Sequence, residues 1–423
     1  MQKESFGKRR SVFHAVLMQI AIRVKYLFLS WFLLKPFLFK NISKYAPRNN
    51  AYKDPPITYF QSLMYKVVIV LVCFTRESGL AAKIAYATGL MRLLHKVQEH
   101  LEKKILENCR KNIPKNQRIP LPEYDWKKGN AEDFFENWVK NPHPVVLRGF
   151  LDNFIDTKEW TFDSLLKKYG EETVFLTKPE VDGYLGKLKE VNSPGVYLHN
   201  SESLFRKYPE LAEKLNFGFI EKYMKKKAGF AQIFVGRKKT GAPMHCANLW
   251  NFFYMLDGKK KWYFVDPNYT FFAYPYFIFG IASGFTYCRY PNDYDKNVYP
   301  LFEYCPTYEV TLQKGDLLLN PPWWWHAVEN VTEKSVGVAS RWFGDGVFGK
   351  DLMMNEENYE INRIFSLTSQ KGPASYSYVH ANLINLNPLY KKEGVTFGEK
   401  RSRYIAFQRV ASKEPILGFR HKL

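Results

Sequence analysis

The chain has 423 residues, a formal net charge of +21, an aromatic content of 17% and five cysteines. This length suffices for one large domain with extensions or for two domains, and the basic charge suits nucleic acid, anionic lipid or acidic protein partners. The absence from the sequence of a C-x-x-C pair argues against a zinc ribbon and a disulfide scaffold, so a reducing compartment fits best. No specific nucleic-acid module is recognisable in it.

The N-terminal segment is basic and apolar. Residues 1–53 contain eleven Lys or Arg and a single acid, Glu4. This composition is typical of a mitochondrial targeting segment or of a helix lying on an anionic membrane. Its apolar runs are shorter than the ~20 residues that a spanning helix needs. The sequence therefore predicts a mitochondrial, membrane-associated protein, and it leaves cleavage and surface binding as alternatives.

A second apolar region covers residues 59–74 and is followed by another over 79–97. Because Lys66, Arg76 and Glu77 interrupt them, an amphipathic pair of helices is favoured over one spanning helix at 57–75. We expect residues 1–117 to form a basic, apolar helical anchor. Its first hundred residues would bind a membrane surface or the subunits of a membrane-protein complex.

The central part of the chain has the pattern of a folded domain. An exposed helix is expected over 95–118, a buried strand in PVVLRGFLDNF, and a helix at 159–170 with Thr161 as N-cap and Gly170 as its stop. Residues 230–345 alternate short aromatic and β-branched runs with turns, which predicts an all-β sandwich or barrel. The predicted domain covers 118–345, and a C-terminal helical and basic tail covers 346–423.

Two predicted strands flank Asp257-Gly258, a strong signal for a two-residue hairpin. In that register Phe253 pairs with Trp262. Alternation along each strand would then place four side chains on one face: His245, Ala247, Asn251 and Lys260. The rest of that face is apolar: Leu249, Phe253, Met255, Trp262 and Phe264.

Burying polar groups on such a face is costly unless they coordinate a metal, pair with another polar group or bind a ligand. The structural alternative is a histidine that bonds a backbone carbonyl and a lysine that extends to the barrel mouth. A second histidine, His326, follows in GDLLLNPPWWWHAVENV, after a predicted strand.

Together these motifs resemble the JmjC and cupin-like family of Fe(II)- and 2-oxoglutarate-dependent oxygenases. The run H-x5-N-F-F is followed by G-x-K, then by G-D-x-L-x-x-P-x-x-W-W-H, and last by a strand ending in Trp342. The resemblance covers about residues 118–345. It implies a mainly β fold with helical additions, a double-stranded β-helix or jelly roll, here preceded by the N-terminal helical membrane-associated region.

The resemblance also implies roles for four residues. His245 and His326 match the iron-binding imidazoles, Lys260 matches the residue that holds the distal carboxylate of 2-oxoglutarate, and Asn251 matches a polar residue of the same pocket. Imidazole suits Fe(II), and a buried cation suits a small dicarboxylate. The departure is Ala247, which stands where the family places the third ligand, a carboxylate.

Neighbouring residues do not supply the missing ligand. Cys246 and Asn248 lie on the opposite face by strand parity. Ala242 and Ser340 stand where hydroxylase-type relatives tend to place Thr and Asn. The metal site is therefore predicted to be degenerate.

Three functions follow from this pattern. The first is a catalytically degenerate domain, with no cofactor, acting as an accessory or scaffold subunit of a membrane-associated, mitochondrial assembly. The second is an active oxygenase of the protein hydroxylase or demethylase type, using Fe(II) and 2-oxoglutarate, with an acid from 268–305, such as those in NDYDK, completing the site. The third is a halogenase, in which chloride occupies the position that Ala247 leaves open.

Overall fold

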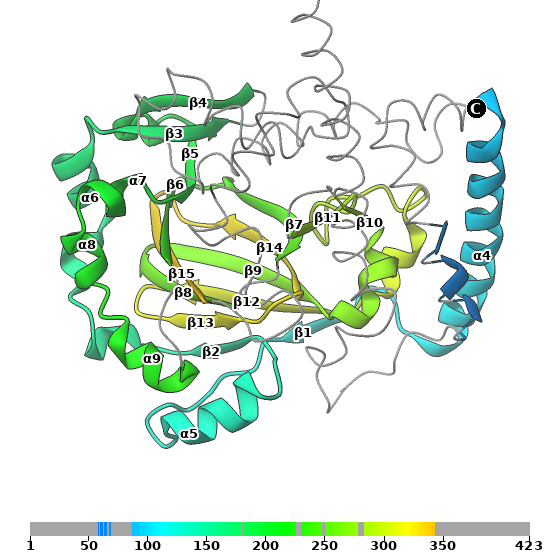
Figure 1. The fold of residues 1–423 in the computed structure, drawn as a ribbon, viewed down its shortest axis with the longest axis horizontal. Helices are drawn as coiled ribbons and strands as arrows, with labels where there is room; N and C mark the ends of the chain where they lie inside the picture. The colour runs from blue at the N-terminus through cyan, green and yellow to red at the C-terminus, as the bar shows by residue number, and fades with distance from the viewer. Residues whose placement is uncertain are drawn as a thin grey trace, which may run out of the picture.

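The computed structural model describes residues 87–342, apart from 179–180, 226–229, 248–249 and 278–282, together with 58, 60–61, 63–65 and 67–68. Within these residues two β-sheets face each other and form the body of the molecule (Figure 1). This arrangement confirms the predicted mainly β, jelly-roll class. The N-terminal segment 1–57 and the tail 346–423 lie outside the described residues.

Each sheet is built from strands that are distant in the sequence. The first sheet contains, in spatial order, β1 (Arg118–Pro120), β12 (Thr307–Gln313), β9 (Lys259–Val265), β14 (Trp325–Asn330), β7 (Gly241–Ala247), β11 (Ser283–Thr286) and β10 (Pro275–Phe277). The second contains β2 (Val145–Leu147), β13 (Leu317–Asn320), β8 (Trp250–Asp257), β15 (Ser335–Trp342), β6 (Phe230–Gly236), β5 (Tyr197–Ser201), β3 (Thr173–Lys178) and β4 (Val181–Lys187).

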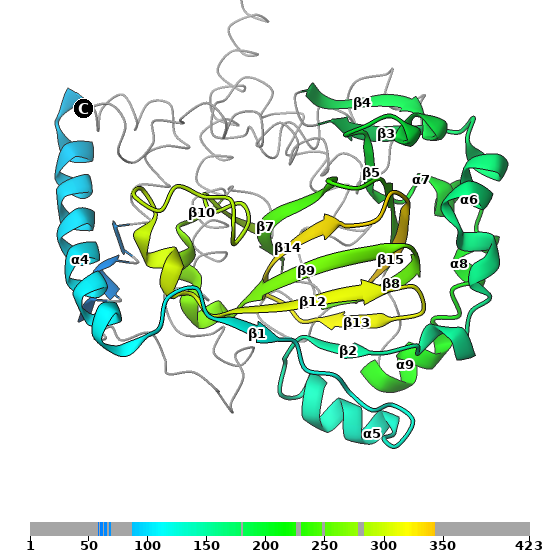
Figure 2. The same cartoon turned by 180° about the vertical axis from the view of Figure 1, so that it is seen from behind.

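Helices lie around the two sheets. The α-helices are α4 (Leu90–Asn112), α5 (Ala131–Phe134), α6 (Phe162–Tyr169), α7 (Ser203–Lys207), α8 (Glu210–Glu213) and α9 (Gly218–Met224). Shorter helical turns are η2 (Phe135–Val139), η3 (Leu151–Asn153), η4 (Thr157–Trp160), η5 (Leu188–Asn192), η6 (Pro267–Ala273) and η7 (Pro300–Tyr304). Seen from either side, α4 lies at one end of the molecule and α6 and α8 at the other (Figures 1 and 2).

Helix α6 has the ends that the sequence predicts. The Thr161 hydroxyl accepts a hydrogen bond from the Ser164 amide at 3.2 Å, and the helix ends at Tyr169, directly before Gly170. Both features satisfy backbone groups that a helix end leaves unpaired.

Helix α4 differs from the exposed helix expected over 95–118. It begins at Leu90 and ends at Asn112. Leu101, Ile105 and Cys109 are buried in the same hydrophobic cluster as the outer face of the barrel. The Tyr274 hydroxyl also bonds the buried carboxylate of Glu102. The helix is therefore packed against the barrel domain along one face. None of the helices in the described part of the chain is long and apolar enough to cross a membrane.

The predicted hairpin at Asp257-Gly258 is wrong. β8 ends at Asp257 and β9 begins at Lys259, and Gly258 has the positive φ of +74° that the turn requires. The two strands nevertheless enter different sheets: β8 pairs with β13 and β15, and β9 with β12 and β14. The turn thus connects the two layers of the barrel.

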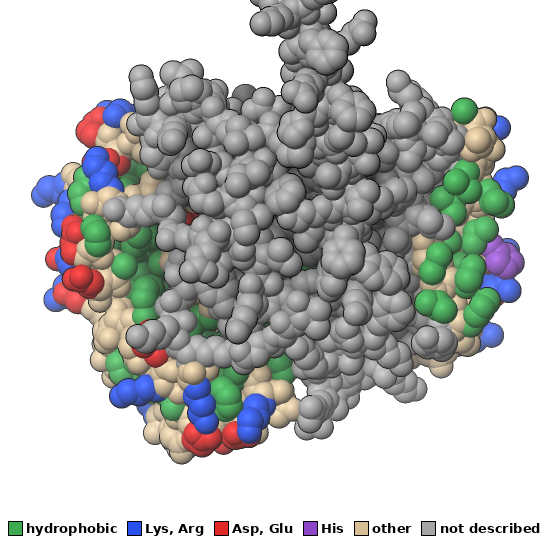
Figure 3. All heavy atoms as spheres, in the orientation of Figure 1, with side chains coloured by type: hydrophobic (Ala, Val, Ile, Leu, Met, Phe, Trp, Pro, Cys, Tyr) green, Lys and Arg blue, Asp and Glu red, His purple; other side chains and the backbone are tan. Residues whose placement is uncertain are grey.

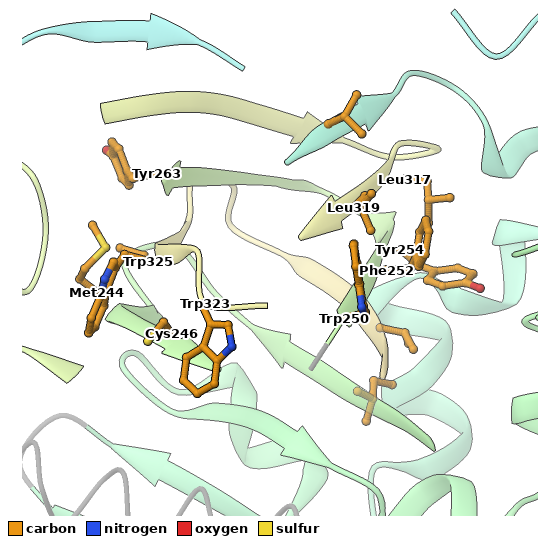
Figure 4. Close-up of a cluster of buried hydrophobic side chains, with 14 of the residues drawn as sticks. Met244, Cys246, Trp250, Phe252, Tyr254, Tyr263, Leu317, Leu319, Trp323 and Trp325 are labelled. Carbon is orange, nitrogen blue, oxygen red and sulfur yellow. The ribbon is translucent and has the colours of Figure 1, made fainter. Parts of the chain in front are cut away.

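The inward and outward faces of the strands form separate hydrophobic clusters. The cluster between the sheets includes Phe253, Met255, Trp262 and Phe264, as the alternation predicted. Outward residues join the larger cluster, of which Figure 4 shows Met244, Cys246, Trp323 and Trp325 at one end and Trp250, Phe252 and Leu319 at the other. Leu249 lies outside the described residues. The predicted face was correct because alternation within a strand does not depend on its partner.

Candidate functional site

The two predicted histidines are directly opposed on neighbouring strands. His245 on β7 and His326 on β14 are Cα partners, and their ring centroids lie 4.2 Å apart. The Nδ1 atom of His245 donates to the Pro243 carbonyl at 2.7 Å, and Nδ1 of His326 donates to the Trp324 carbonyl at 2.9 Å. Since a carbonyl only accepts, Nδ1 of each ring carries a proton, and in the neutral form of the ring Nε2 is the nitrogen with the lone pair.

A strained turn positions His326. Trp323 has a φ of +68°, a left-handed conformation that is unfavourable for a non-glycine residue. Its amide donates to the Ala247 carbonyl at 2.7 Å, and its ring is buried in the outer cluster. The Pro-Pro-Trp segment is thereby attached to the end of β7, which brings the strand carrying His326 beside the strand carrying His245.

Lys260 lies on β9 and is only 1% exposed. Its ammonium group is 3.2 Å from the Tyr197 hydroxyl and between 5.2 and 5.5 Å from the ring centroids of Tyr197, Phe234 and Phe253. Burial lowers the pKa of Lys260 from 10.5 to about 7, because the charged form loses its hydration. Among the described residues, an aromatic box and one hydroxyl are the groups that stabilise this amine as a cation.

The structure brings all four predicted site residues to one pocket. It has about 540 Å³ of empty space, open solvent at its mouth included. His245, His326, Lys260 and Asn251 line it. The pocket also receives polar side chains that the sequence analysis did not select: Tyr197, His199, Asn200 and Arg341. No Asp or Glu from the described residues lines the pocket.

Two amides lie at the level of the imidazoles. Asn251 on β8 is the Cα partner of Asn320 on β13, and both are 2% exposed. The amide nitrogen of Asn320 is 3.3 Å from Nε2 of His326. The Oδ1 atoms of both amides are buried without a hydrogen-bond partner among the residues that the structure describes. Asn320 was missed because its strand reads as a plain apolar run, LLLN.

The side chains around Ala247, where the family resemblance implies the third metal ligand, lie in part on the faces that strand alternation predicts. Ala247 ends β7 on the face of His245 by alternation and is 8% exposed. Cys246 lies on the opposite face, in the outer cluster, and Asn248 lies outside the described residues. The acids of NDYDK do not complete the site, because Asp293 and Asp295 are exposed and do not line the pocket.

Ser340 does not face the pocket, in contrast to Ala242, which lines it. The Ser340 hydroxyl donates to the Phe252 carbonyl at 3.3 Å and accepts from the Trp342 indole at 2.9 Å. Arg341, the next residue, lines the pocket instead.

These residues fit a carboxylate ligand better than iron. A facial triad needs two imidazoles and a carboxylate. The described residues contain no group of three or more His, Cys, Asp or Glu side chains arranged to hold a metal. A small carboxylate, by contrast, would pair with the Lys260 cation in a pocket whose walls are apolar there. As iron ligands and cosubstrate contacts, the four residues remain predictions.

The fold and the pocket resemble a cupin-like domain of the JmjC type. Residues 180–347 match the family model of the cupin-like domain. The chain is 23% identical to lysine-specific demethylase JMJ21 of Arabidopsis thaliana over 269 residues, which cover 54% of this chain and 27% of the relative.

Two further relatives are similar over shorter segments. Human HSPB1-associated protein 1 is 29% identical over 110 residues, 26% of this chain and 22% of that protein. The tRNA wybutosine-synthesizing protein 5 of Gallus gallus is 26% identical over 243 residues, 49% of this chain and 72% of that protein. The chain thus spans about a quarter of the length of the first two relatives.

Proposed function

We propose that the protein is a catalytically degenerate JmjC-like domain that binds a small carboxylate without an iron centre. In this proposal it is an accessory or scaffold subunit of a membrane-associated, mitochondrial assembly. The observation that carries the proposal is the composition of the pocket. Two imidazoles and a buried lysine line it, and no Asp or Glu from the described residues does, while the family resemblance implies that the third ligand would stand at Ala247.

The contact of Asn320 supports the same conclusion. Its amide donates to Nε2 of His326, the lone pair that would otherwise coordinate a metal. A metal that binds His326 must first break this bond. Binding of an anionic ligand would explain why Lys260 is retained, because a buried cation without a counter-charge is otherwise costly.

Apolar side chains near the N-terminus support attachment to a membrane or a membrane-bound partner. Among the described residues, Phe60, Val67, Leu90 and Leu93 are exposed large hydrophobics, with 58% of Leu93 accessible. Figure 3 shows apolar side chains along α4 beside Lys and Arg. Apolar groups flanked by basic ones suit an anionic lipid surface. The mitochondrial assignment rests on the composition of residues 1–53.

Metal analysis of the protein purified with its native partners tests the proposal. We expect well under one iron per chain and no consumption of 2-oxoglutarate. Stoichiometric iron together with turnover would refute the proposal. Extraction of membranes at alkaline pH tests the attachment: release indicates peripheral binding, and retention indicates insertion.

The second candidate function is an active oxygenase. Retention of His245, His326 and Lys260 in one pocket favours it, since a scaffold does not need all three. The relatives named as a demethylase and as a tRNA-wybutosine-synthesizing protein point the same way. This alternative requires a third ligand from outside the described residues. Loss of iron from a variant truncated after residue 345, with the barrel still folded, would locate that ligand in the tail.

A further inference from the structure

Lys260 places a primary amine in the wall of the pocket, where its side chain is 1% exposed. No Asp or Glu among the described residues lines the pocket. Burial away from a counter-charge disfavours the ammonium form, so the pKa of Lys260 falls to about 7. At pH 7 about half of the molecules therefore carry a neutral amine, against about one in three thousand for a lysine with the ordinary pKa of 10.5.

A hydroxyl lies within hydrogen-bond distance of this amine. The Oη atom of Tyr197 is 3.2 Å from Nζ of Lys260. Tyr197 on β5 is the Cα partner of Gly236 on β6, and a Cβ atom at position 236 would lie 2.5 Å from the tyrosine ring. The ring of His199 stacks on that of Tyr197, with the centroids 5.5 Å apart. The glycine thus leaves room for the ring, and the imidazole supports it beside the amine.

A neutral amine beside a hydroxyl has the groups that imine formation needs. A desolvated lysine of lowered pKa is a nucleophile toward a carbonyl carbon. A hydroxyl at hydrogen-bond distance can transfer protons to the departing oxygen. The rings of Tyr197, Phe234 and Phe253, with centroids between 5.2 and 5.5 Å from Nζ, stabilise the iminium cation that forms during this reaction.

We propose that Lys260 forms an imine with a small aldehyde or ketone in the pocket, and that Tyr197 transfers the protons. Nζ attacks the carbonyl carbon, so a C–N bond forms and the electron pair of the carbonyl π bond moves to oxygen. Both amine protons reach this oxygen through the Tyr197 hydroxyl, and the oxygen leaves as water while the C=N bond forms. One amine and one carbonyl thus yield one imine and one water.

This activity goes beyond the proposed function. Carboxylate binding uses the ammonium form of Lys260, whereas imine formation uses the neutral amine. The other titratable or charged side chains that line the pocket are Tyr197, His199, His245, His326 and Arg341. Among the described residues that line it, Lys260 is the one primary amine, so an amine adduct formed in the pocket is assigned to this residue.

The test is reductive trapping on the full chain with butanal and sodium cyanoborohydride, at pH 7 and in excess EDTA. The hydride converts the imine to a stable butylamine, and mass spectrometry of chymotryptic peptides locates it. We expect Lys260 to be modified at least about tenfold faster than its exposed neighbour Lys259, because exposed lysines are in general protonated at this pH. Unfolding in urea should remove this preference.

Two tyrosine variants test the proton transfer. Tyr197→Phe should slow the modification of Lys260 at least about tenfold and leave that of Lys259 unchanged. The rate at Lys260 should rise with pH and level off above about 7, and the same profile in Tyr197→Phe would show that the amine itself is not displaced. Tyr263→Phe removes a hydroxyl that bonds Glu329 outside the pocket and should react like the wild type. Thermal unfolding shows that each variant is folded.

The outcomes separate the two proposals. Modification of Lys260 no faster than that of Lys259, or a preference that persists in urea, would overturn the imine. An unchanged rate in Tyr197→Phe would overturn the assignment of the proton transfer to Tyr197. Stoichiometric iron with turnover would overturn the proposed function and leave selective trapping at Lys260 as it stands.

Discussion

The amide nitrogen of Asn320 lies 3.3 Å from Nε2 of His326, on the side of the ring opposite its bond to the Trp324 carbonyl. Both nitrogens of this imidazole are therefore engaged by the protein. These two contacts fix the ring as one neutral tautomer, as is also the case for metal-binding histidines. Here, however, an amide lies at Nε2, the nitrogen that would bind a metal. In the proposed function, the alanine at position 247 and this amide act in the same direction, because both disfavour a bound metal.

Metal affinity should return in two steps. Ala247→Asp supplies the missing carboxylate, and we expect Co(II) to bind at least about tenfold more tightly than to the wild type. Adding Asn320→Ala should increase the affinity further, because it removes the competing hydrogen bond to His326. Titration followed by the Co(II) absorption bands measures both steps. Adding His245→Ala to Ala247→Asp should abolish the gain, and an unchanged affinity there would place the metal elsewhere.

Anion binding should weaken as the pH rises above about 7. Burial lowers the pKa of Lys260 to about 7, so in the free protein the amine loses its proton above this pH. A bound carboxylate requires the cation, so binding takes up a proton, and the affinity falls by up to about tenfold per pH unit. Calorimetry of glutarate binding between pH 6.5 and 8.5, in buffers of different ionisation enthalpy, measures both effects. Equal affinity across this range would contradict the prediction.

The same lysine should make stability depend on pH. Its pKa is about 7 in the folded protein, below the ordinary value of 10.5. At pH values between these two, the unfolded chain therefore binds more protons than the folded one. The free energy of unfolding therefore rises with pH in this window, by at most about 1.4 kcal/mol per unit, and the full penalty of the buried charge is present below it. Urea unfolding at pH 6.5 and 8.5 measures the slope.

Lys260→Met should remove this slope and stabilise the protein near neutral pH by about 1–4 kcal/mol, as for other buried ionic groups replaced by apolar ones. Lys261→Met is the matched control, because the neighbouring lysine is partly exposed and pairs with Glu309. It should leave the slope unchanged. A wild-type slope in Lys260→Met would assign the titration to another group.

The turn before β13 depends on a buried carboxylate. Asp316 is fully buried, pairs with Arg148 at 2.6 Å and accepts the amides of Gly149 and Gln313 at 3.1 and 3.0 Å. Asp316→Ala leaves these donors unpaired and should lower the free energy of unfolding by about 3–5 kcal/mol. Asp163→Ala, which breaks an exposed pair with Lys334, should cost less than about 1 kcal/mol. Denaturant unfolding compares the two, and similar losses would show that the buried pair is unimportant.

Much of the barrel was predictable from local patterns. Alternation placed His245 and Lys260 on inward faces and Cys246 on an outward face, because the direction of a side chain along a strand is a local property. Thr161 and Gly170 marked the ends of α6 for the same reason. The pairing of β8 with β9 was wrong, because a Gly-containing turn also serves to connect two layers.

The sequence by itself determined the class of fold and the inward faces of its strands, and it placed Ala247 where the family resemblance implies an acid. Only the tertiary structure decided which side chains meet there. It placed Asn320 on His326 and Arg341, rather than Ser340, in the pocket. The physical reason is that alternation fixes directions within one strand, whereas the register between distant strands decides which of these side chains share a cavity.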